Sequence, residues 1–170
     1  MLTKIRPIRR EDLSSVLSWR NHPDVRQYMY TQQEIAWEEH LAWFESVCAR
    51  DNSHVMIFEN DGIPSGVLNI DIVSKSDKRA EWGFYLSPMA AKGSGPLLGS
   101  QACEFVFESL GLHKLCGEVL AYNHRSIKFH ERLGFKQEAI LREHHCDGSR
   151  YHDVIGFGLL AAEWKVQRRT

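Results

Sequence analysis

A glycine-rich turn, Lys92-Gly93-Ser94-Gly95, is the part of this 170-residue sequence whose residue types most directly suggest chemistry. Glycines remove side chains where a backbone turns tightly, and the first N–H groups of a following helix have no partner within that helix. Those donors and the positive end of the helix dipole attract a phosphate or a pyrophosphate, and Lys92 adds a positive charge. The same spacing also serves purely structural turns, so residues elsewhere must decide between the two uses.

The turn differs from two better-defined phosphate loops. No Gly-Lys-Ser or Gly-Lys-Thr follows it, as a Walker loop requires, and residues 96–99 do not supply the third glycine of a dinucleotide fingerprint in register.

The pattern around the turn predicts a strand at residues 79–86, a helix at 96–110 and a strand at 115–120. Two strands joined through a helix are expected to be parallel, with a right-handed connection. An earlier hairpin, residues 55–59 and 66–73 around an Asn-Asp-Gly turn, makes the predicted sheet mixed.

The flanking regions complete an α/β arrangement. Residues 2–8 predict an opening strand, which is followed by a short helix. Thr31 and Glu34, at capping-box spacing, predict the start of a second helix. The C-terminal part predicts a short helix at 125–133 and two strands flanking an Asp-Gly turn at 147–148.

Composition limits the class of protein. The chain has 21 Lys and Arg against 22 Asp and Glu, which gives no general reason to expect nucleic-acid binding. Its apolar runs are too short to cross a bilayer, and its N-terminus leads into a strand-like segment, so we expect one cytoplasmic domain spanning residues 1–170, without a membrane partner. The four scattered cysteines suggest neither disulfides nor zinc, and we expect them to be buried small hydrophobes.

The order Trp82-Gly83-Phe84-Tyr85-Leu86, Gly93-x-Gly95, Asn123-x-x-Ser126 and Leu133-Gly134-Phe135 resembles the GNAT superfamily of N-acetyltransferases. The resemblance implies a mixed central sheet of about seven strands with flanking helices, whose fourth and fifth strands splay apart to admit acetyl-CoA. In that superfamily the glycine-rich turn binds the pyrophosphate. Gln or Arg usually stands three residues before its first glycine, where this chain has Ala90.

Further segments are similar to the flagellin-modification acetyltransferases of pseudaminic acid biosynthesis. They are Trp19-Arg20-Asn21, the 25–29 stretch, His40 with Trp43-Phe44, and the ending from Tyr151 to Trp164. The resemblance implies acetylation of the 4-amino group of a UDP-linked 4-amino-4,6-dideoxy-N-acetyl-altrosamine. The partner is then a small molecule, with the chain a monomer or homodimer.

Acetyl transfer to an amine needs a neutral nucleophile, a donor for the developing oxyanion and a proton for the departing thiolate. The superfamily usually places a tyrosine where this chain has His130, and an imidazole can donate a proton near neutral pH. The alternative for His130 is a core residue with satisfied nitrogens. The resemblance also assigns the backbone N–H of Leu86 to the carbonyl oxygen.

Other candidate residues fall into three groups. Asn123 and Ser126 are helix-capping residues that also match cofactor-binding positions of the superfamily. Asn69, Asp71 and Glu81, with Tyr85 as a further lining group of the cofactor and substrate sites, are candidates for a water chain that deprotonates the amine; the alternative is a solvated strand face. Arg20 and Arg26 are candidates for the diphosphate and His40 for a phosphate or the uracil, against surface salt bridges and helix packing.

Two further questions are whether the chain binds a metal and which functions compete with a nucleotide-sugar enzyme. The His and Asp residues at 144–147 and 152–153 have metal-ligand types, but adjacent strand residues point to opposite faces, so we expect no metal. A protein or ribosomal N-terminal acetyltransferase, or a non-catalytic acyl-CoA-binding module, is the alternative to a nucleotide-sugar enzyme.

Overall fold

A computed structural model describes residues 2–169, and its strands form one seven-stranded mixed sheet in the order β1-β2-β3-β4-β5-β7-β6. This confirms the predicted mixed sheet with flanking helices. The chain divides into two compact units, which are described separately. The first comprises the chain up to Asp71 together with Gly83–Gln101, and the second comprises Ile72–Trp82 together with the chain from Ala102. The single domain expected for residues 1–170 stays a prediction.

The first unit is built on antiparallel strands. β1 (Thr3–Pro7) pairs with β2 (Ser53–Asn60), which pairs with β3 (Ile63–Ser74), and the end of β4 (Arg79–Leu86) belongs to the same unit. Side chains alternate between the two faces of a strand, so Val67 and Asn69 of β3 share one face while Leu68 and Ile70 take the other.

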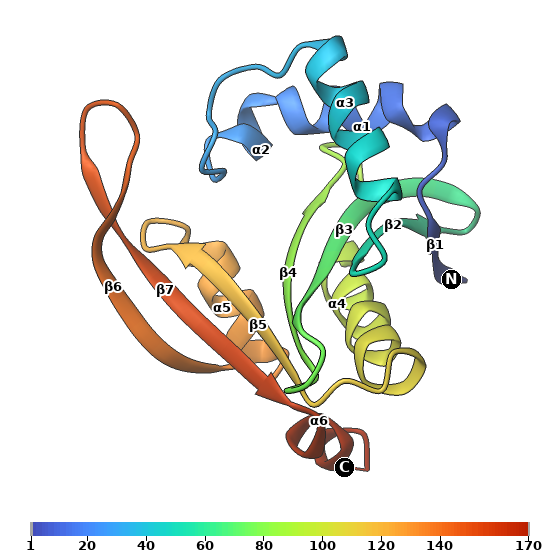
Figure 1. Cartoon of the computed structure of the whole chain (residues 1–170), viewed down its shortest axis with the longest axis vertical. Coiled ribbons are helices and arrows are strands. Elements are labelled where there is room, and N and C mark those ends of the chain that lie inside the picture. The colour runs from blue at the N-terminus through green and yellow to red at the C-terminus, as the bar shows by residue number, and fades with distance from the viewer. Residues whose placement is uncertain (1, 170) are drawn as a thin grey trace. The chain divides into compact units, whose positions relative to one another are not determined.

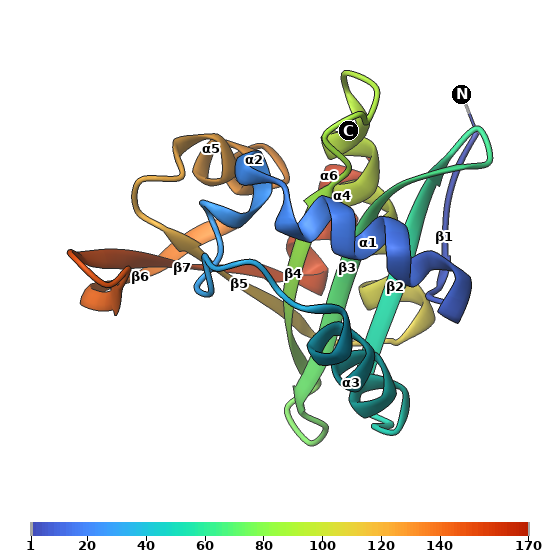
Figure 2. The ribbon, with the colours of Figure 1, turned by 90° about the horizontal axis from the view of Figure 1, so that it is seen from above.

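Helices cover the Val67 face of these strands (Figures 1 and 2). A 3-10 turn (Arg10–Asp12) leads into α1 (Leu13–Asn21) and α2 (Pro23–Arg26), and α3 (Trp37–Cys48) follows. A hydrophobic cluster joins these layers: its buried members include Leu13, Val16, Val47, Ile57 and Val67. The helices are thus fixed to the sheet by apolar burial, which is the main driving force of folding.

The predicted capping box at Thr31 and Glu34 is wrong, because α3 begins only at Trp37 with Ala36 as its N-cap. The segment before it is held in a non-helical path by α1 instead. The Asn21 side chain donates to the Ile35 carbonyl at 2.9 Å and accepts from the Ile35 N–H at 2.8 Å. Tertiary hydrogen bonds to this loop therefore override the local capping pattern.

The second unit contains the paired part of β4 and β5 and the C-terminal hairpin. α4 (Ser94–Glu104) belongs to the first unit as far as Gln101 and continues into a π-helical turn (Phe105–Ser109). β5 (Lys114–Leu120) pairs in parallel with β4 from Arg79–Lys114 to Trp82–Gly117, as the strand–helix–strand pattern predicted. Then come α5 (His124–Arg132), β6 (Lys136–Cys146), β7 (Tyr151–Leu160) and α6 (Ala161–Gln167). β7 pairs antiparallel with both β5 and β6.

The burial of the cysteines and the lengths of the helices can be compared with the expectations from composition. Cys103 is buried as expected, but Cys48 and Cys146 are exposed, so the expectation of buried cysteines is wrong for these two, which lie near the ends of their helix and strand. No helix among residues 2–169 has the length and apolarity needed to cross a membrane.

An ion cluster ties the first strand to the first turn. Arg6 donates two hydrogen bonds of 2.8 Å to the Asp12 carboxylate and one of 2.6 Å to Glu59, and all three side chains are largely buried. Burial opposes ionisation of Asp12, but the hydrogen bonds from Arg6 and from the Arg9 N–H outweigh it and lower the pKa of Asp12. The Arg6 hydrogen bond also lowers the pKa of Glu59.

We expect Arg6→Met to reduce the free energy of unfolding at pH 7 by about 3–5 kcal/mol, because the buried Asp12 carboxylate loses its counter-charge, whereas Glu59 keeps the ammonium group of Lys4 at 3.1 Å. In the wild type, both carboxylates have lowered pKa values, so their contribution is present above about pH 4 and is lost as the pH falls further. In Arg6→Met the Asp12 carboxylate favours protonation, so the stability of the variant should instead rise as the pH falls toward 5. Urea unfolding across this range measures both effects. Arg9→Met, which removes an exposed side chain paired with Glu11, is the control and should change stability by less than about 0.5 kcal/mol.

Candidate functional site

The glycine-rich turn enters α4 in the conformation that the sequence suggested. Gly93 has a φ of 91°, in the left-handed region that favours glycine, and α4 starts at the next residue. Ser94 is buried, and its hydroxyl donates to the Ala91 carbonyl at 2.7 Å, which closes the turn. The N–H groups of Gly93 and Gly95 lie at the start of α4, before the first N–H that has an intrahelical acceptor. The turn therefore offers backbone donors beside the exposed Lys92.

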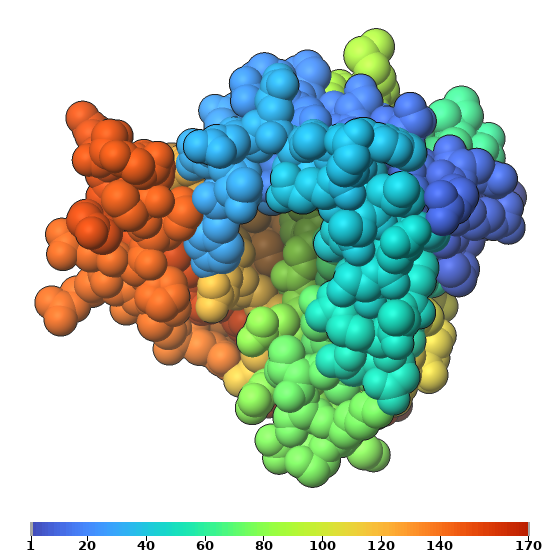
Figure 3. All heavy atoms as spheres, turned by 45° about the horizontal axis from the view of Figure 1, so that its top comes forward, coloured from blue at the N-terminus to red at the C-terminus, as the bar shows by residue number. Residues whose placement is uncertain are grey.

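A pocket of about 190 Å³ lies within the first unit. Seven residues from α1, the loop before α3, α3 itself, β3 and β4 line it, namely Arg20, Ile35, Glu39, His40, Trp43, Asn69 and Tyr85. The molecular surface is hollowed beside the cyan residues of α3 (Figure 3). The structure thus brings together four residues that the sequence nominated for different tasks: Arg20, His40, Asn69 and Tyr85.

Arg20 reaches this pocket from the last turn of α1. Its Nη2 donates to the Thr31 carbonyl at 2.8 Å, whereas its Nη1 is buried without a hydrogen-bond partner. Burial lowers the pKa of Arg20, while nearby Tyr85 and Glu39 act in the opposite direction. A guanidinium remains charged throughout the physiological range, so Arg20 presents an unpaired cationic N–H group in the pocket.

Asn69 and Tyr85 contribute from the sheet. Asn69 is paired in register with Val55 of β2, and its Oδ1 is buried without a hydrogen-bond partner. Tyr85 packs against the hydrophobic cluster, and burial raises the pKa of its phenol well above the ordinary value. The pocket therefore holds a neutral phenol and an unpaired acceptor next to the unpaired donor of Arg20.

His40 is buried at the back of the same pocket. Its Nε2 lies 3.0 Å from the Leu13 carbonyl, so this nitrogen carries the proton, and its ring is stacked on Trp43 with centroids 5.2 Å apart. Burial lowers the pKa of His40, so the ring is neutral near pH 7 and its Nδ1 is a hydrogen-bond acceptor. Such a ring suits an N–H or O–H group of a ligand better than a phosphate oxygen.

The remaining nominated polar residues lie outside this lining. Arg26 is half-buried on α2, and the Asp71 carboxylate accepts the hydroxyl of Ser53 across the β2–β3 pair. Glu81 is an exposed residue of β4 in the second unit.

Ile35, Glu39 and Trp43 also line the pocket, although the sequence did not nominate them as site residues. A usable signal exists for two of them, because Glu39 and Trp43 are four residues apart in α3 and so share the helix face that carries His40.

In the second unit, His130 lies inside an aromatic cluster. Its ring is 5.6 Å from Trp82, 5.0 Å from Phe135 and 5.1 Å from Phe157, measured between centroids. Its Nε2 points toward Gly117 of β5, where an added Cβ would lie 3.0 Å from this nitrogen and 2.9 Å from Trp82 Nε1. The absence of a side chain at Gly117 is therefore what lets both rings approach the strand.

The protonation state of His130 follows from its contacts. Nδ1 lies 2.8 Å from the carbonyl oxygen of Ser126, which accepts, so Nδ1 carries the proton and Nε2 does not. Burial lowers the pKa of His130 to about 4, against the opposing effect of the Ser126 hydrogen bond. At neutral pH the ring is uncharged, and a proton can leave from Nε2 only after a change that raises this pKa.

The start of α5 shows how Asn123 and Ser126 are used locally. Asn123 is the N-cap, and its side chain accepts the Ser126 N–H at 3.2 Å. This is the capping role expected for asparagine before a helix. A cofactor contact by either residue stays a prediction.

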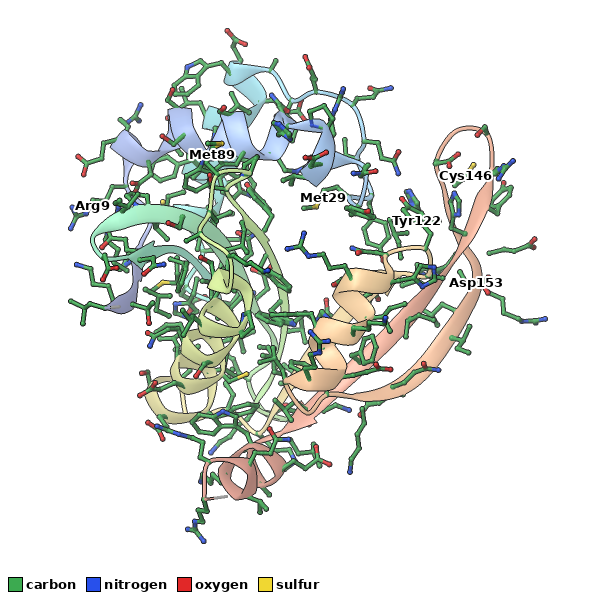
Figure 4. All side chains as sticks on the ribbon, turned by 180° about the vertical axis from the view of Figure 1, so that it is seen from behind. Arg9, Met29, Met89, Tyr122, Cys146 and Asp153 are labelled. Atoms are coloured by element: carbon green, nitrogen blue, oxygen red, sulfur yellow. The ribbon has the colours of Figure 1, made fainter. Side chains whose placement is uncertain are left out.

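The β6–β7 hairpin carries the histidines that raised the question of a metal. Figure 4 shows Cys146 near its tip and Asp153 farther along β7, with Tyr122 nearby. His152 pairs with Asp147 at 2.7 Å, and Asp153 accepts the N–H of Glu143, a residue with a φ of 48° at a register shift of the ladder. No group of three His, Cys, Asp or Glu side chains in the described part of the chain is arranged to hold a metal ion.

Comparison with known proteins identifies the class of this molecule. Residues 3–136 match the family model of the acetyltransferase (GNAT) domain. Acetyltransferase PseH of Campylobacter jejuni is 32% identical over 126 residues, which are 74% of this chain and 77% of that protein. Spermidine N(1)-acetyltransferase of Escherichia coli is 24% identical over 168 residues, which are 98% of this chain and 90% of that protein. The crystal structure of spermidine N-acetyltransferase from Vibrio cholerae in complex with CoA and spermine has a TM-score of 0.90 at 21% identity, covering 96% of this chain and 98% of that one.

We expect the imidazole of His130 to remain neutral with its proton on Nδ1 from pH 8 down to about pH 5, and to titrate near pH 4, because of its burial and the Ser126 carbonyl. The pKa is lowered below the ordinary value of about 6.5, so the contribution of His130 to stability is present above pH 6.5 and is lost as the pH falls toward 4. Histidine side-chain ¹⁵N NMR across this range reads the tautomer and the pKa directly. His130→Gln removes the signal and assigns it; titration near pH 6.5, or a proton on Nε2, would contradict the assignment.

Proposed function

Because the chain belongs to the GNAT family of acetyltransferases, we propose that it transfers the acetyl group of acetyl-CoA to an amino group of a UDP-linked amino sugar. The family makes the chain an N-acetyltransferase. The finer assignment, acetylation of the 4-amino group of a UDP-linked 4-amino-4,6-dideoxy-N-acetyl-altrosamine, rests on the segments that resemble the pseudaminic acid enzymes. The relative PseH supports it, with 32% identity over 74% of this chain.

The observation that carries the choice of acceptor is the buried guanidinium of Arg20 in the pocket. Polyamines are the competing acceptors, since two of the similar proteins act on or bind spermidine or spermine. A polyamine carries several ammonium groups at neutral pH and needs several carboxylates. This pocket offers one carboxylate, Glu39, whose charge Arg20 already offsets, so no carboxylate is left over for the ammonium groups of a polyamine.

The charges of the lining also support an assignment of the parts of the proposed ligand. Arg20 and Glu39 offset each other and His40 is neutral, so the pocket has no net charge to attract a diphosphate. We therefore assign the pocket to the uncharged sugar or base moiety, and its volume of about 190 Å³ suits one such moiety. Arg26, outside the lining, is the better candidate for the diphosphate. Nδ1 of His40 can accept an N–H group, which a uracil ring provides.

The glycine-rich turn fits the pyrophosphate of acetyl-CoA, which supplies an acetyl group activated as a thioester. The N–H groups of Gly93 and Gly95, the open space at Gly93 and the charge of Lys92 form the anion site, while Ser94 closes the turn. Tyr85 and Leu86 of β4, with Asn123 and Ser126 of α5, are the proposed remaining contacts to the cofactor.

For the reaction, Leu86 is the proposed oxyanion donor. The next N–H group, that of Ser87, donates to the Ser65 carbonyl of β3 at 2.8 Å. Successive N–H groups of a strand point to opposite edges, so the Leu86 N–H points away from β3. Asn69, Asp71 and Glu81 remain candidates for guiding the amine proton to solvent, and His130 for the thiolate proton, on the condition that its pKa rises above about 4 during the reaction.

We expect mass spectrometry to detect an increase of one acetyl group in a UDP-linked 4-amino-4,6-dideoxy-2-acetamido sugar incubated with the protein and acetyl-CoA. Spermidine under the same conditions should react at least about 100-fold more slowly, because the pocket has no carboxylate left over for its ammonium groups. Acetylated spermidine as the dominant product would reject the sugar-nucleotide proposal and leave the family assignment intact.

We expect Gly93→Val to weaken acetyl-CoA binding about tenfold in calorimetry, since a branched side chain at a φ of 91° strains the turn by about 1–2 kcal/mol and displaces its N–H groups. Gly62→Val is the matched control, because Gly62 also has a positive φ and open space around a Cβ but lies in the β2–β3 turn. Equal acetyl-CoA affinity in the two variants would argue against the anion site at the turn.

A further inference from the structure

The pocket of the first unit contains two buried polar atoms of opposite hydrogen-bonding character, neither of which has a partner. They are Nη1 of Arg20, a donor, and Oδ1 of Asn69, an acceptor. Buried polar groups in folded proteins are almost always hydrogen-bonded. Two such exceptions in the lining of one pocket indicate that a ligand supplies the missing partners.

We propose that Arg20 and Asn69 together bind the acetamido group of the acceptor sugar, with Arg20 donating to its carbonyl oxygen and Asn69 accepting its N–H. This inference rests on the proposed function and names the feature of the substrate that this pocket selects.

The choice follows from which ligand groups can satisfy both atoms. A phosphate offers only acceptors and would leave Oδ1 of Asn69 unpaired, and an ammonium group offers only donors and would leave Nη1 of Arg20 unpaired. A secondary amide presents an acceptor and a donor on neighbouring atoms, without net charge. That neutrality also matches a lining in which Arg20 is offset by Glu39.

The rest of the lining suits the methyl group of an acetamide. Ile35, Trp43 and Tyr85 give the pocket an apolar component, and Trp43 is held in place by its stack with His40. Burial of a methyl group against such side chains is favourable, and a free amine or a hydroxyl at the same position would not provide it.

Both polar groups are held by the fold before the ligand arrives. The other terminal nitrogen of Arg20 is anchored on the Thr31 carbonyl, and Asn69 lies in β3, which is paired along its length with β2. Because little reorganisation is needed, the pair discriminates between substrates rather than adapting to them. A ligand group with donors only or with acceptors only would leave one of the two atoms unpaired.

The test compares two acceptors that differ only at C2, a UDP-linked 4-amino sugar with a 2-acetamido group and the same compound with a 2-hydroxyl group. We expect wild-type kcat/KM to favour the acetamido compound by roughly 100-fold or more. Asn69→Leu should reduce kcat/KM for the acetamido compound much more than for the hydroxyl compound, so that the ratio of the two falls to within about threefold of one; a loss common to both compounds cancels in this ratio. Asn69→Gln, which retains the amide oxygen on a side chain longer by one methylene, should keep more of the preference than Asn69→Leu.

Asn60→Leu is the matched control, because Asn60 is also a buried asparagine with an unpartnered Oδ1 at the end of a strand, yet it lies outside the pocket. It should retain the wild-type preference. Circular dichroism and acetyl-CoA binding show that each variant is folded.

The outcomes separate this inference from the proposed function. If the wild type acetylates both compounds with equal kcat/KM, the acetamido assignment is wrong while the acetylation of UDP-amino sugars stands. If Asn69→Leu keeps the full preference for the acetamido compound, the acetamido assignment is likewise wrong and the acetylation of UDP-amino sugars stands. If the wild type acetylates neither compound, the proposed function fails and this inference with it.

Discussion

The packing of α1 and α3 on one face of β2 and β3 is the interaction on which the rest of the first unit depends. Leu13 and Val16 of α1 and Val47 of α3 meet Ile57 and Val67 of the sheet in a continuous apolar layer. The pocket opens where this layer gives way to polar side chains. Asn69, which lines the pocket, lies two residues after Val67 on the same face of β3. Its walls are therefore as rigid as the core from which they extend, which is what a site that selects among similar ligands requires.

Two largely buried arginines in this unit show opposite uses of the same side chain. Arg6 makes hydrogen bonds to Asp12 and Glu59 that satisfy its charge, and these contacts fix β1 to the first turn. Arg20 makes one hydrogen bond to the loop before α3 and keeps Nη1 without a partner. A fully paired buried charge stabilises or orders a structure, whereas a buried charge that lacks a partner is destabilising until something binds to it. The contrast is the physical basis for assigning a structural role to Arg6 and a ligand to Arg20.

The aromatic cluster of the second unit imposes a different constraint. Trp82, Phe135 and Phe157 surround His130 and exclude the water that would stabilise an imidazolium. The ring is consequently neutral, and the carbonyl of Ser126 fixes which nitrogen carries the proton. A histidine at the position where the family usually has a tyrosine is thus kept uncharged, as a phenol would be at the same pH. Any proton that His130 donates or accepts in a reaction therefore has to pass through Nε2.

Local sequence patterns determined most of the fold and part of the site. The glycine-rich turn, the strand–helix–strand order and the Asn123 cap could be predicted because glycine, proline and capping residues act within a few positions along the chain. The mixed sheet followed from the hairpin and the parallel pair, and Asn69 was placed on the polar face of its strand by the period of two. The capping box at Thr31 could not be judged this way, because the hydrogen bonds from Asn21 to Ile35 that displace the helix start join residues 14 positions apart.

Only the tertiary structure decided which polar residues work together. Arg20, Asn69 and Tyr85 are separated by long stretches of sequence and meet because their helix and strands pack on one core, while Arg26 and Asp71, equally plausible in the sequence, remain outside the pocket. The charge state of His130 and the unpaired atoms of Arg20 and Asn69 likewise depend on burial by distant side chains. Burial and hydrogen-bond partners are properties of contacts in space, and the residue types by themselves carry no record of them.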